Sequence, residues 1–256
     1  MGKEIKVTVL GSGTSTGVPV VGCRCPVCTS DDPRDHRTRA SLWLQAEGLS
    51  ILFDTCTEFR IQALKAGIRH IDAVFLTHAH ADHVHGLDDL RPLTHHVPIP
   101  VYGSRKTLGE IEERFSYIFR HSPFGGGVPR VSLRSIDSAV TLGPSVLEVI
   151  PVPVFHGSLE VYGYRVGPFA YLTDCNEIPD ASYSLLAGVE VIVIDALRFR
   201  SHPTHFNIAR AVEAVRRVGA KTAYFTHLGH ELSYRELLNA LREGFFLAFD
   251  GLTHIL

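Results

Sequence analysis

The chain has 256 residues, and its 25 lysine and arginine residues against 27 aspartate and glutamate residues leave a formal charge of −2. With 45% hydrophobic and 20% charged residues it is a typical globular sequence, which excludes a disordered or fibrous protein. Near-neutral charge argues against a broad nucleic-acid-binding face, and no apolar run reaches the ~18 residues of a membrane span. The N-terminus lacks the apolar core of a signal peptide, so a cytoplasmic protein without membrane or nucleic-acid partners is expected. A homodimer stays open.

Strands and helices alternate along the predicted chain. In chain order the predictions are strand 6–10, a hairpin of strands 41–45 and 50–54, helix 58–66, strand 73–77, helices 83–93 and 107–119, a loop at 121–127, strands 147–154, 161–166, 169–173 and 189–194, helix 208–218, strand 221–226, helix 234–242, and a final hairpin of 247–249 with 252–256. No linker or low-complexity tract interrupts this order. We therefore expect one α/β domain over residues 1–256.

Histidine is unusually frequent, with 15 residues, and four potential metal ligands follow the strand predicted at 73–77. They are His78, His80, Asp82 and His83, in an H-x-H-x-D-H string. In a loop at a strand end these side chains can converge on cations, whereas a regular helix or strand would separate them. Imidazole together with carboxylate favours manganese or zinc. The string therefore predicts a metal site.

Three further ligand-type residues stand at the ends of later predicted strands: His156, Asp174 and His227. Singly, each is a weak signal, because a lone histidine or aspartate at a strand end is often structural. Their order and separation, one after each of three strands, make the set a strong signal. Asp54 also ends a strand and is a candidate to orient a ligand imidazole, although the same residue could simply be a capping residue.

Three of the five cysteines, Cys23, Cys25 and Cys28, fall within six residues. Disulfides are unusual in a reducing compartment, so this C-x-C-x-x-C spacing favours metal ligation. The isolated Cys56 is expected to be a core residue.

The histidine string resembles that of the metallo-β-lactamase superfamily. This resemblance implies an αββα sandwich of two sheets flanked by helices. It also implies that His78, His80 and His156 hold one divalent metal ion, that Asp82, His83 and His227 hold a second, and that Asp174 bridges the two. The expected ions are manganese or zinc.

Further motifs resemble the phosphoribosyl cyclic phosphodiesterase branch of that superfamily. These motifs are GSGTSTGVP at 11–19, GCRCPVC at 22–28, HPTHFN at 202–207 and THLGH at 226–230. The resemblance implies that Cys23, Cys25, Cys28 and His230 hold a structural zinc ion, with the zinc-binding loop at about 22–36. It also implies that His205 and Asp82 are catalytic residues, and that His205 is not a metal ligand. His202 could exchange roles with His205.

The resemblance implies a metal-dependent phosphoric diester hydrolase in which a hydroxide bridging two metals attacks a small, cyclic phosphodiester. A ribonuclease Z-like endonuclease shares the ligand set, but the charge of −2 and the lack of a long basic insertion disfavour RNA. A lactonase or thioesterase on the same scaffold also stays open. A non-enzymatic metal-binding protein would not need all seven active-site ligands.

Overall fold

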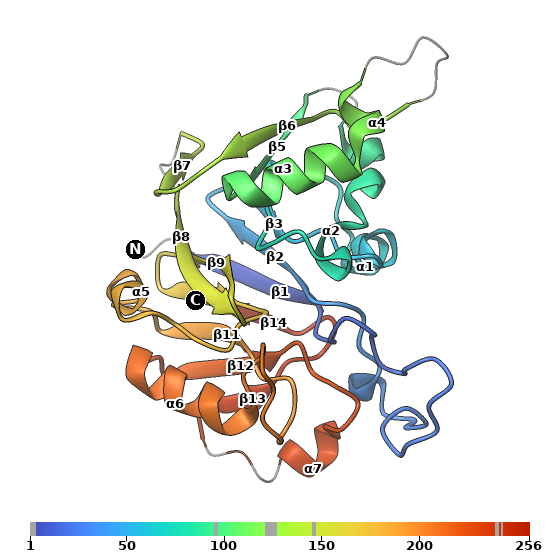
Figure 1. Ribbon diagram of the computed structural model, residues 1–256, viewed down its shortest axis with the longest axis vertical. Coiled ribbons are helices and arrows are strands. Elements are labelled where there is room, and N and C mark those ends of the chain that lie inside the picture. The colour runs from blue at the N-terminus through green and yellow to red at the C-terminus, as the bar shows by residue number, and fades with distance from the viewer. Residues whose placement is uncertain (1–3, 95–96, 121–126, 145–146, 239–240, 242) are drawn as a thin grey trace.

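The computed structural model describes residues 4–94, 97–120, 127–144, 147–238, 241 and 243–256. The loop predicted at 121–127 lies outside these residues except for Gly127. Two sheets of seven strands each form the centre of the molecule (Figure 1). Within the described part of the chain, no helix is both long enough and apolar enough to cross a membrane.

The first sheet combines the N-terminal half of the chain with the last strand, in the order β14-β1-β2-β3-β4-β5-β6. Its strands are β1 (Ile5–Gly11), β2 (Ser41–Ala46), β3 (Leu49–Phe53), β4 (Ala73–Phe75), β5 (Ile99–Gly103), β6 (Val131–Ser135) and β14 (Thr253–Ile255). Its helical segments are α1 (Phe59–Ala66), α2 (Ala81–Val84), α3 (Arg105–Arg114), α4 (Ser116–Phe119) and the 3₁₀ segment Leu87–Leu93. A further 3₁₀ turn, Pro33–Asp35, lies in the loop before β2.

The second sheet comes from the C-terminal half, in the order β13-β12-β11-β10-β9-β8-β7. Its strands are β7 (Val140–Leu142), β8 (Leu147–His156), β9 (Leu159–Val166), β10 (Phe169–Leu172), β11 (Val191–Asp195), β12 (Thr222–Thr226) and β13 (Phe245–Leu247). The helices of this half are α5 (Asp180–Leu185), α6 (Ile208–Val218) and α7 (Tyr234–Leu238).

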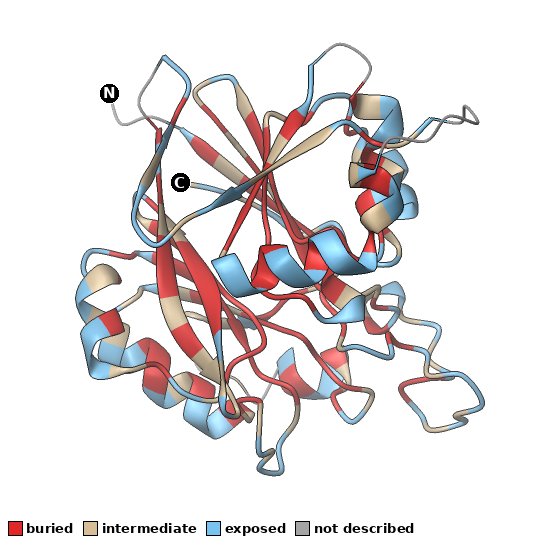
Figure 2. Cartoon of the chain, turned by 45° about the horizontal axis from the view of Figure 1, so that its top comes forward, coloured by how far each residue is buried: buried red, intermediate tan, exposed pale blue. Residues whose placement is uncertain are grey.

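Alternation along the strands builds three apolar layers. Phe53 and Phe75 face the second sheet, where they pack with Tyr164. Their neighbours Leu52 and Val74 face the opposite way, into the layer that contains the side chains of α1 and α3. A third layer packs α6 against the second sheet, and buried residues run along both sheets (Figure 2). Since successive side chains of a strand point to opposite faces, each sheet buries both faces, which confirms the predicted αββα sandwich.

Local signals set several helix ends where the sequence predicts them. Gly67 and Gly219 adopt the left-handed conformation directly after α1 and α6, which ends both helices. The helix predicted at 107–119 instead divides at Phe115 into α3 and α4. The prediction at 83–93 was also wrong in detail. The helix begins at Ala81 and gives way at Gly86 to a 3₁₀ segment that contains Pro92.

The predicted C-terminal hairpin was wrong. β13 pairs in parallel with β12 in the second sheet, whereas β14 pairs antiparallel with β1 in the first. The connecting residues turn at Gly251, which has a φ of 93°, a value that glycine adopts readily. The two apolar segments therefore complete different sheets instead of pairing with each other.

Candidate metal centre

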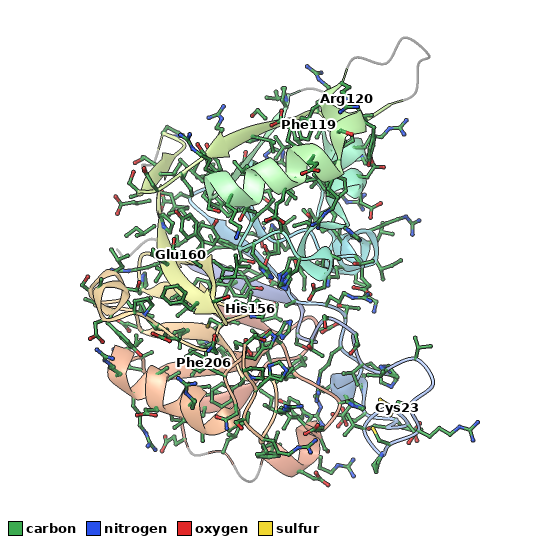
Figure 3. The ribbon with its side chains drawn as sticks, viewed as in Figure 1. Cys23, Phe119, Arg120, His156, Glu160 and Phe206 are labelled. Atoms are coloured by element: carbon green, nitrogen blue, oxygen red, sulfur yellow. The ribbon has the colours of Figure 1, made fainter. Side chains whose placement is uncertain are left out.

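The seven predicted ligands stand at the ends of four strands. The H-x-H-x-D-H string follows β4, His156 is the last residue of β8, Asp174 follows β10, and His227 follows β12. These strands belong to both sheets, and Figure 3 shows His156 near the centre of the molecule, between its two halves. The sandwich therefore brings ligands from positions 78 to 227 to one edge.

The ligand atoms form two groups, in each of which they all lie within 4.8 Å of one another. One contains His78, His80, His156 and Asp174, and the other contains Asp82, His83, Asp174 and His227. Asp174 belongs to both: its Oδ2 lies 3.8 Å from His78 Nε2, and its Oδ1 lies 3.1 Å from His83 Nε2. This is the grouping that the resemblance implies.

The chemistry of these groups fits divalent cations. The Nε2 atoms of His78, His83 and His227 are buried and have no hydrogen-bond partner, which is costly unless an ion is bound. Burial opposes ionisation of the carboxylates, but the charge of neighbouring histidines outweighs it and holds the pKa of Asp82 and Asp174 well below the ordinary value. Buried nitrogen lone pairs and anionic oxygens together form a donor set for manganese or zinc.

Hydrogen bonds at Nδ1 orient two of the predicted ligand histidines. His83 Nδ1 lies 2.8 Å from the fully buried Asp54 carboxylate, and His156 Nδ1 lies 2.8 Å from the Thr204 carbonyl oxygen. Since a carbonyl or carboxylate oxygen accepts, each Nδ1 donates, and each Nε2 is left free to face an ion. The structure thus places Asp54 where the sequence predicts an orienting carboxylate.

Backbone strain concentrates at the same place. Three residues of the site have positive φ although none is glycine: Asp54 at 61°, Asp174 at 50° and His227 at 58°. Such conformations carry a cost and persist at sites where the surrounding structure holds them. Each of the three follows a strand, so the turn aims the side chain into the centre instead of continuing the strand.

His205 lies next to both ligand groups. Its ring centroid is 4.6 Å from that of His156 and 4.7 Å from that of His227. Its Nδ1 donates to Asp195 Oδ2 at 2.6 Å, so its Nε2 is on the opposite side of the ring. Burial lowers the pKa of His205 and raises that of Asp195 well above its ordinary value. His202, by contrast, has no carboxylate partner among the described residues.

Sequence reasoning missed Asp195. It ends β11 in the way that Asp174 follows β10, so the strand-end signal applied to it as well. Asp195 also lies near His205 and His227 in a third potential ligand group. Its hydrogen bond to His205 indicates a positioning role for this carboxylate.

The three cysteines and His230 form a separate cluster, and Figure 3 shows Cys23 in a loop away from His156. His230 Nδ1 lies 3.3 Å from Cys23 Sγ and 3.5 Å from the Sγ atoms of Cys25 and Cys28. Tetrahedral zinc with bonds of about 2.3 Å to sulfur and 2.0 Å to nitrogen requires S···N separations of roughly 3.5 Å. The Cys28 backbone N–H lowers the pKa of Cys25 to about 6, toward the thiolate that binds metal, whereas burial raises the pKa of Cys28 to about 11.

A buried arginine fastens this region independently of the cysteines. The Arg37 guanidinium donates to Asp35 at 2.9 Å and to the carbonyl oxygens of Gly229 at 2.9 Å and Leu232 at 2.6 Å. These two carbonyls flank His230. Arg37 therefore helps to hold His230 beside the cysteine loop, a role that the sequence did not signal.

Replacing Cys23 by serine is expected to lower the bound zinc by about one equivalent and to leave the metals of the other centre in place. Serine oxygen is a much poorer zinc ligand than thiolate, and a site with three ligands no longer closes the tetrahedron. Metal content of the purified protein measures this. Cys56→Ser, outside the cluster, is the matched control, and an unchanged zinc content in Cys23→Ser would contradict the assignment.

Comparison with known proteins agrees with this geometry. A family described as Beta-lactamase superfamily domain matches residues 50–228. A crystal structure of a new diphosphatase from the PhnP family is 44% identical, with a TM-score of 0.92 over 99% of this chain and 97% of that chain. The Zn²⁺-bound PqqB from Methylobacterium extorquens is 22% identical, with a TM-score of 0.75 over 97% of this chain and 99% of that one, a likeness of fold.

A curated relative carries a different name. The Octanoyltransferase of Porphyromonas gingivalis (strain ATCC BAA-308 / W83) is 39% identical over 255 residues, which cover 98% of this chain and 52% of that protein. The chain thus spans about half the length of this relative.

Proposed function

The chain belongs to the β-lactamase superfamily, and from that membership we propose that it is a dinuclear metal-dependent hydrolase of a small phosphodiester, such as a phosphoribosyl cyclic phosphate. The observation that carries the proposal is the convergence of seven ligand side chains from both sheets, with His205 and Asp195 directly beside them. The similarity to a PhnP-family diphosphatase over nearly the whole chain supports attack at phosphorus.

Two divalent ions in such a centre supply charge neutralisation at the phosphoryl group and lower the pKa of water to about 7. The protein's own side chains then position the attacking water and protonate the departing oxygen. The Asp82 side chain is 12% exposed, whereas that of Asp174 is 3% exposed, so of the two carboxylates we assign Asp82 to orient the attacking water. His205, held by Asp195, delivers a proton from Nε2 to the departing oxygen. The negative charge of the substrate favours the protonated ring that this step needs.

A diphosphate linkage is the second candidate for the bond that is cleaved. It is favoured by the 44% identity to a PhnP-family diphosphatase over nearly the whole chain. Water attacks phosphorus in both cases, and only the leaving group differs: an alkoxide from a diester, or a phosphate ester from a diphosphate.

We do not extend the octanoyltransferase name to this chain. Acyl transfer through a cysteine needs an activated thiolate, and among the cysteines outside the zinc-type cluster, Cys56 and Cys175 are both fully buried. Burial raises the pKa of the Cys56 thiol, and that of the Cys175 thiol rises well above its ordinary value for the same reason. Neither presents a thiolate to a substrate.

The proposal is tested by metal analysis followed by turnover on a substrate panel. We expect about three metals per chain, activity that is lost with a chelator and restored with Mn²⁺ or Zn²⁺, and highest turnover on a phosphodiester or diphosphate diester. The panel contains bis(4-nitrophenyl) phosphate, a ribose cyclic phosphate, a diphosphate diester, a lactone and a precursor transfer RNA. Preferred cleavage of the lactone or the RNA, or activity that survives metal removal, would overturn the proposal. A single bound metal would indicate a scaffold role.

A further inference from the structure

The loop between β11 and α6 lies beside the metal centre. Its base is closed by two backbone hydrogen bonds, from Leu197 N to Phe206 O at 2.9 Å and from Ile208 N to Arg198 O at 3.1 Å. His156 donates to the Thr204 carbonyl of this loop, and Figure 3 marks both His156 and Phe206. The loop also carries His205. The conformation of this loop therefore sets the positions of both His156 and His205.

His202, in this loop, has a defined tautomer. Its Nδ1 lies 3.3 Å from the Thr204 backbone nitrogen and 3.2 Å from the Thr204 hydroxyl oxygen. A backbone N–H only donates, so Nδ1 accepts, and the proton of the neutral ring is on Nε2. Among the described residues this Nε2 has no hydrogen-bond partner, and it is not one of the buried unpartnered atoms. His202 therefore presents an open N–H donor.

The His202 ring lies next to the ring of His205, the proposed proton donor. The centroids of His202 and His205 are 5.1 Å apart, and His202 is half-buried where His205 is buried. His205 faces the departing oxygen of the proposed reaction. A group attached to that oxygen, on the leaving side of the scissile bond, would lie next to His202.

A positive charge accompanies the donor. Burial is the main cause that lowers the pKa of both His202 and His205, and the positive charge of Arg198 adds a smaller lowering. Its Nη2 donates to the Ser201 carbonyl at 3.0 Å and its Nε is buried without a partner, and it has no carboxylate within ion-pair distance among the described residues. Arg200, two residues on, is instead neutralised by Glu231 at 2.8 Å.

From these observations we propose that the His202 Nε2–H, supported by the charge of Arg198, forms an anion subsite that binds a second phosphoryl group on the leaving side of the scissile phosphorus. The subsite rests on the proposed hydrolase function and defines its substrate class as diphosphate diesters in preference to simple phosphodiesters. In the reaction, the water oxygen bonds to phosphorus and releases its proton to solvent, the P–O–P bond breaks, and the phosphate ester departs as an anion that the subsite holds.

Two variants of His202 separate binding from loop support. Asparagine places its amide oxygen near the position of Nδ1, so His202→Asn keeps an acceptor for Thr204 and removes the outer donor. Glutamine places its amide nitrogen near Nε2, so His202→Gln keeps a donor and loses the acceptor. The proposal predicts that His202→Asn raises KM for P¹,P²-bis(4-nitrophenyl) diphosphate by about 10- to 100-fold, the effect of losing a hydrogen bond to a charged group. kcat should change little, and His202→Gln should restore most of the affinity.

Bis(4-nitrophenyl) phosphate is the matched substrate without a second phosphoryl group, and its KM should be the same in wild type and His202→Asn. Arg198→Gln should raise KM for the diphosphate selectively, while the paired Arg200→Gln serves as control and should not. If His202→Gln is impaired and His202→Asn is normal, His202 only supports the loop and the subsite is overturned. Equal changes on both substrates would also overturn it, while the proposed function would stand.

A binding measurement keeps the two proposals separate. Calorimetric titration of the metal-loaded protein with methylenediphosphonate should show about 10-fold or more weaker binding to His202→Asn than to wild type. This readout does not require turnover. If no phosphorus substrate is cleaved, the proposed function fails and the titration still decides the subsite, because equal affinity would overturn it.

Discussion

Replacing Asp174 by asparagine is expected to lower turnover by about a thousandfold or more and to remove both metals of the main centre. Asp174 is the residue that both ligand groups share, with Oδ2 3.8 Å from His78 Nε2 of one group and Oδ1 3.1 Å from His83 Nε2 of the other. A neutral amide cannot supply the negative charge that two cations need between them. The loss corresponds to the several kcal/mol that metal charge contributes to a transition state. Metal content and kcat measured together test this.

The zinc of the cysteine cluster should remain in Asp174→Asn, so this variant should bind about one metal ion per chain. Cys23→Ser, which keeps the main centre, should bind about two. Asp180→Asn, at an exposed position in α5, is the matched control and should keep all three. Thermal unfolding with and without chelator provides a second measurement. Wild type should lose stability when its metals are removed, whereas the variant should respond less. Full metal content in Asp174→Asn would contradict its position between the two ions.

His205→Ala is expected to lower kcat by about 10²–10⁴-fold on substrates with poor leaving groups, the usual contribution of a positioned general acid. His205 is 9% exposed, contacts the rings of His156 and His227, and is oriented by Asp195. An alkoxide needs its proton, whereas 4-nitrophenolate leaves without one, so the loss on bis(4-nitrophenyl) phosphate should be much smaller. Parallel kinetics on an alkyl and an aryl diester measure the difference.

Metal content should be unchanged in His205→Ala, and His70→Ala, at an exposed surface position, should behave as wild type. Equal losses on the two esters would contradict the acid role. A fall in metal content would show instead that His205 acts as a ligand within the group it forms with Asp195 and His227.

Much of the sandwich could be predicted because its signals are local. Alternating runs predict β2 and β3, and glycines at positive φ end α1 and α6 where the sequence places them. The H-x-H-x-D-H string predicts clustering because its four ligands span only six positions. The later ligands were found from their place at strand ends, and their convergence follows from the meeting of those ends at one edge.

Other features depend on contacts that no local pattern encodes. Asp195 lies ten positions before His205 and orients it only because β11 and the following loop come together. Arg37 holds carbonyls 192 and 195 positions away. The last two apolar segments resemble a hairpin, yet β13 and β14 complete different sheets, β13 beside β12 and β14 beside β1.

The sequence by itself determined the ligand types, their order and their place after strands, since these follow from residue chemistry and short periodicities. Only the tertiary structure decided which of the predicted ligand atoms lie close together, and that Asp54 and Thr204 orient two of the histidines. It also gave His205 rather than His202 the carboxylate partner. The physical reason is distance along the chain: hydrogen bonds of 2.6–2.8 Å between residues 10 to 48 positions apart exist only once the strands and loops that carry these residues have assembled.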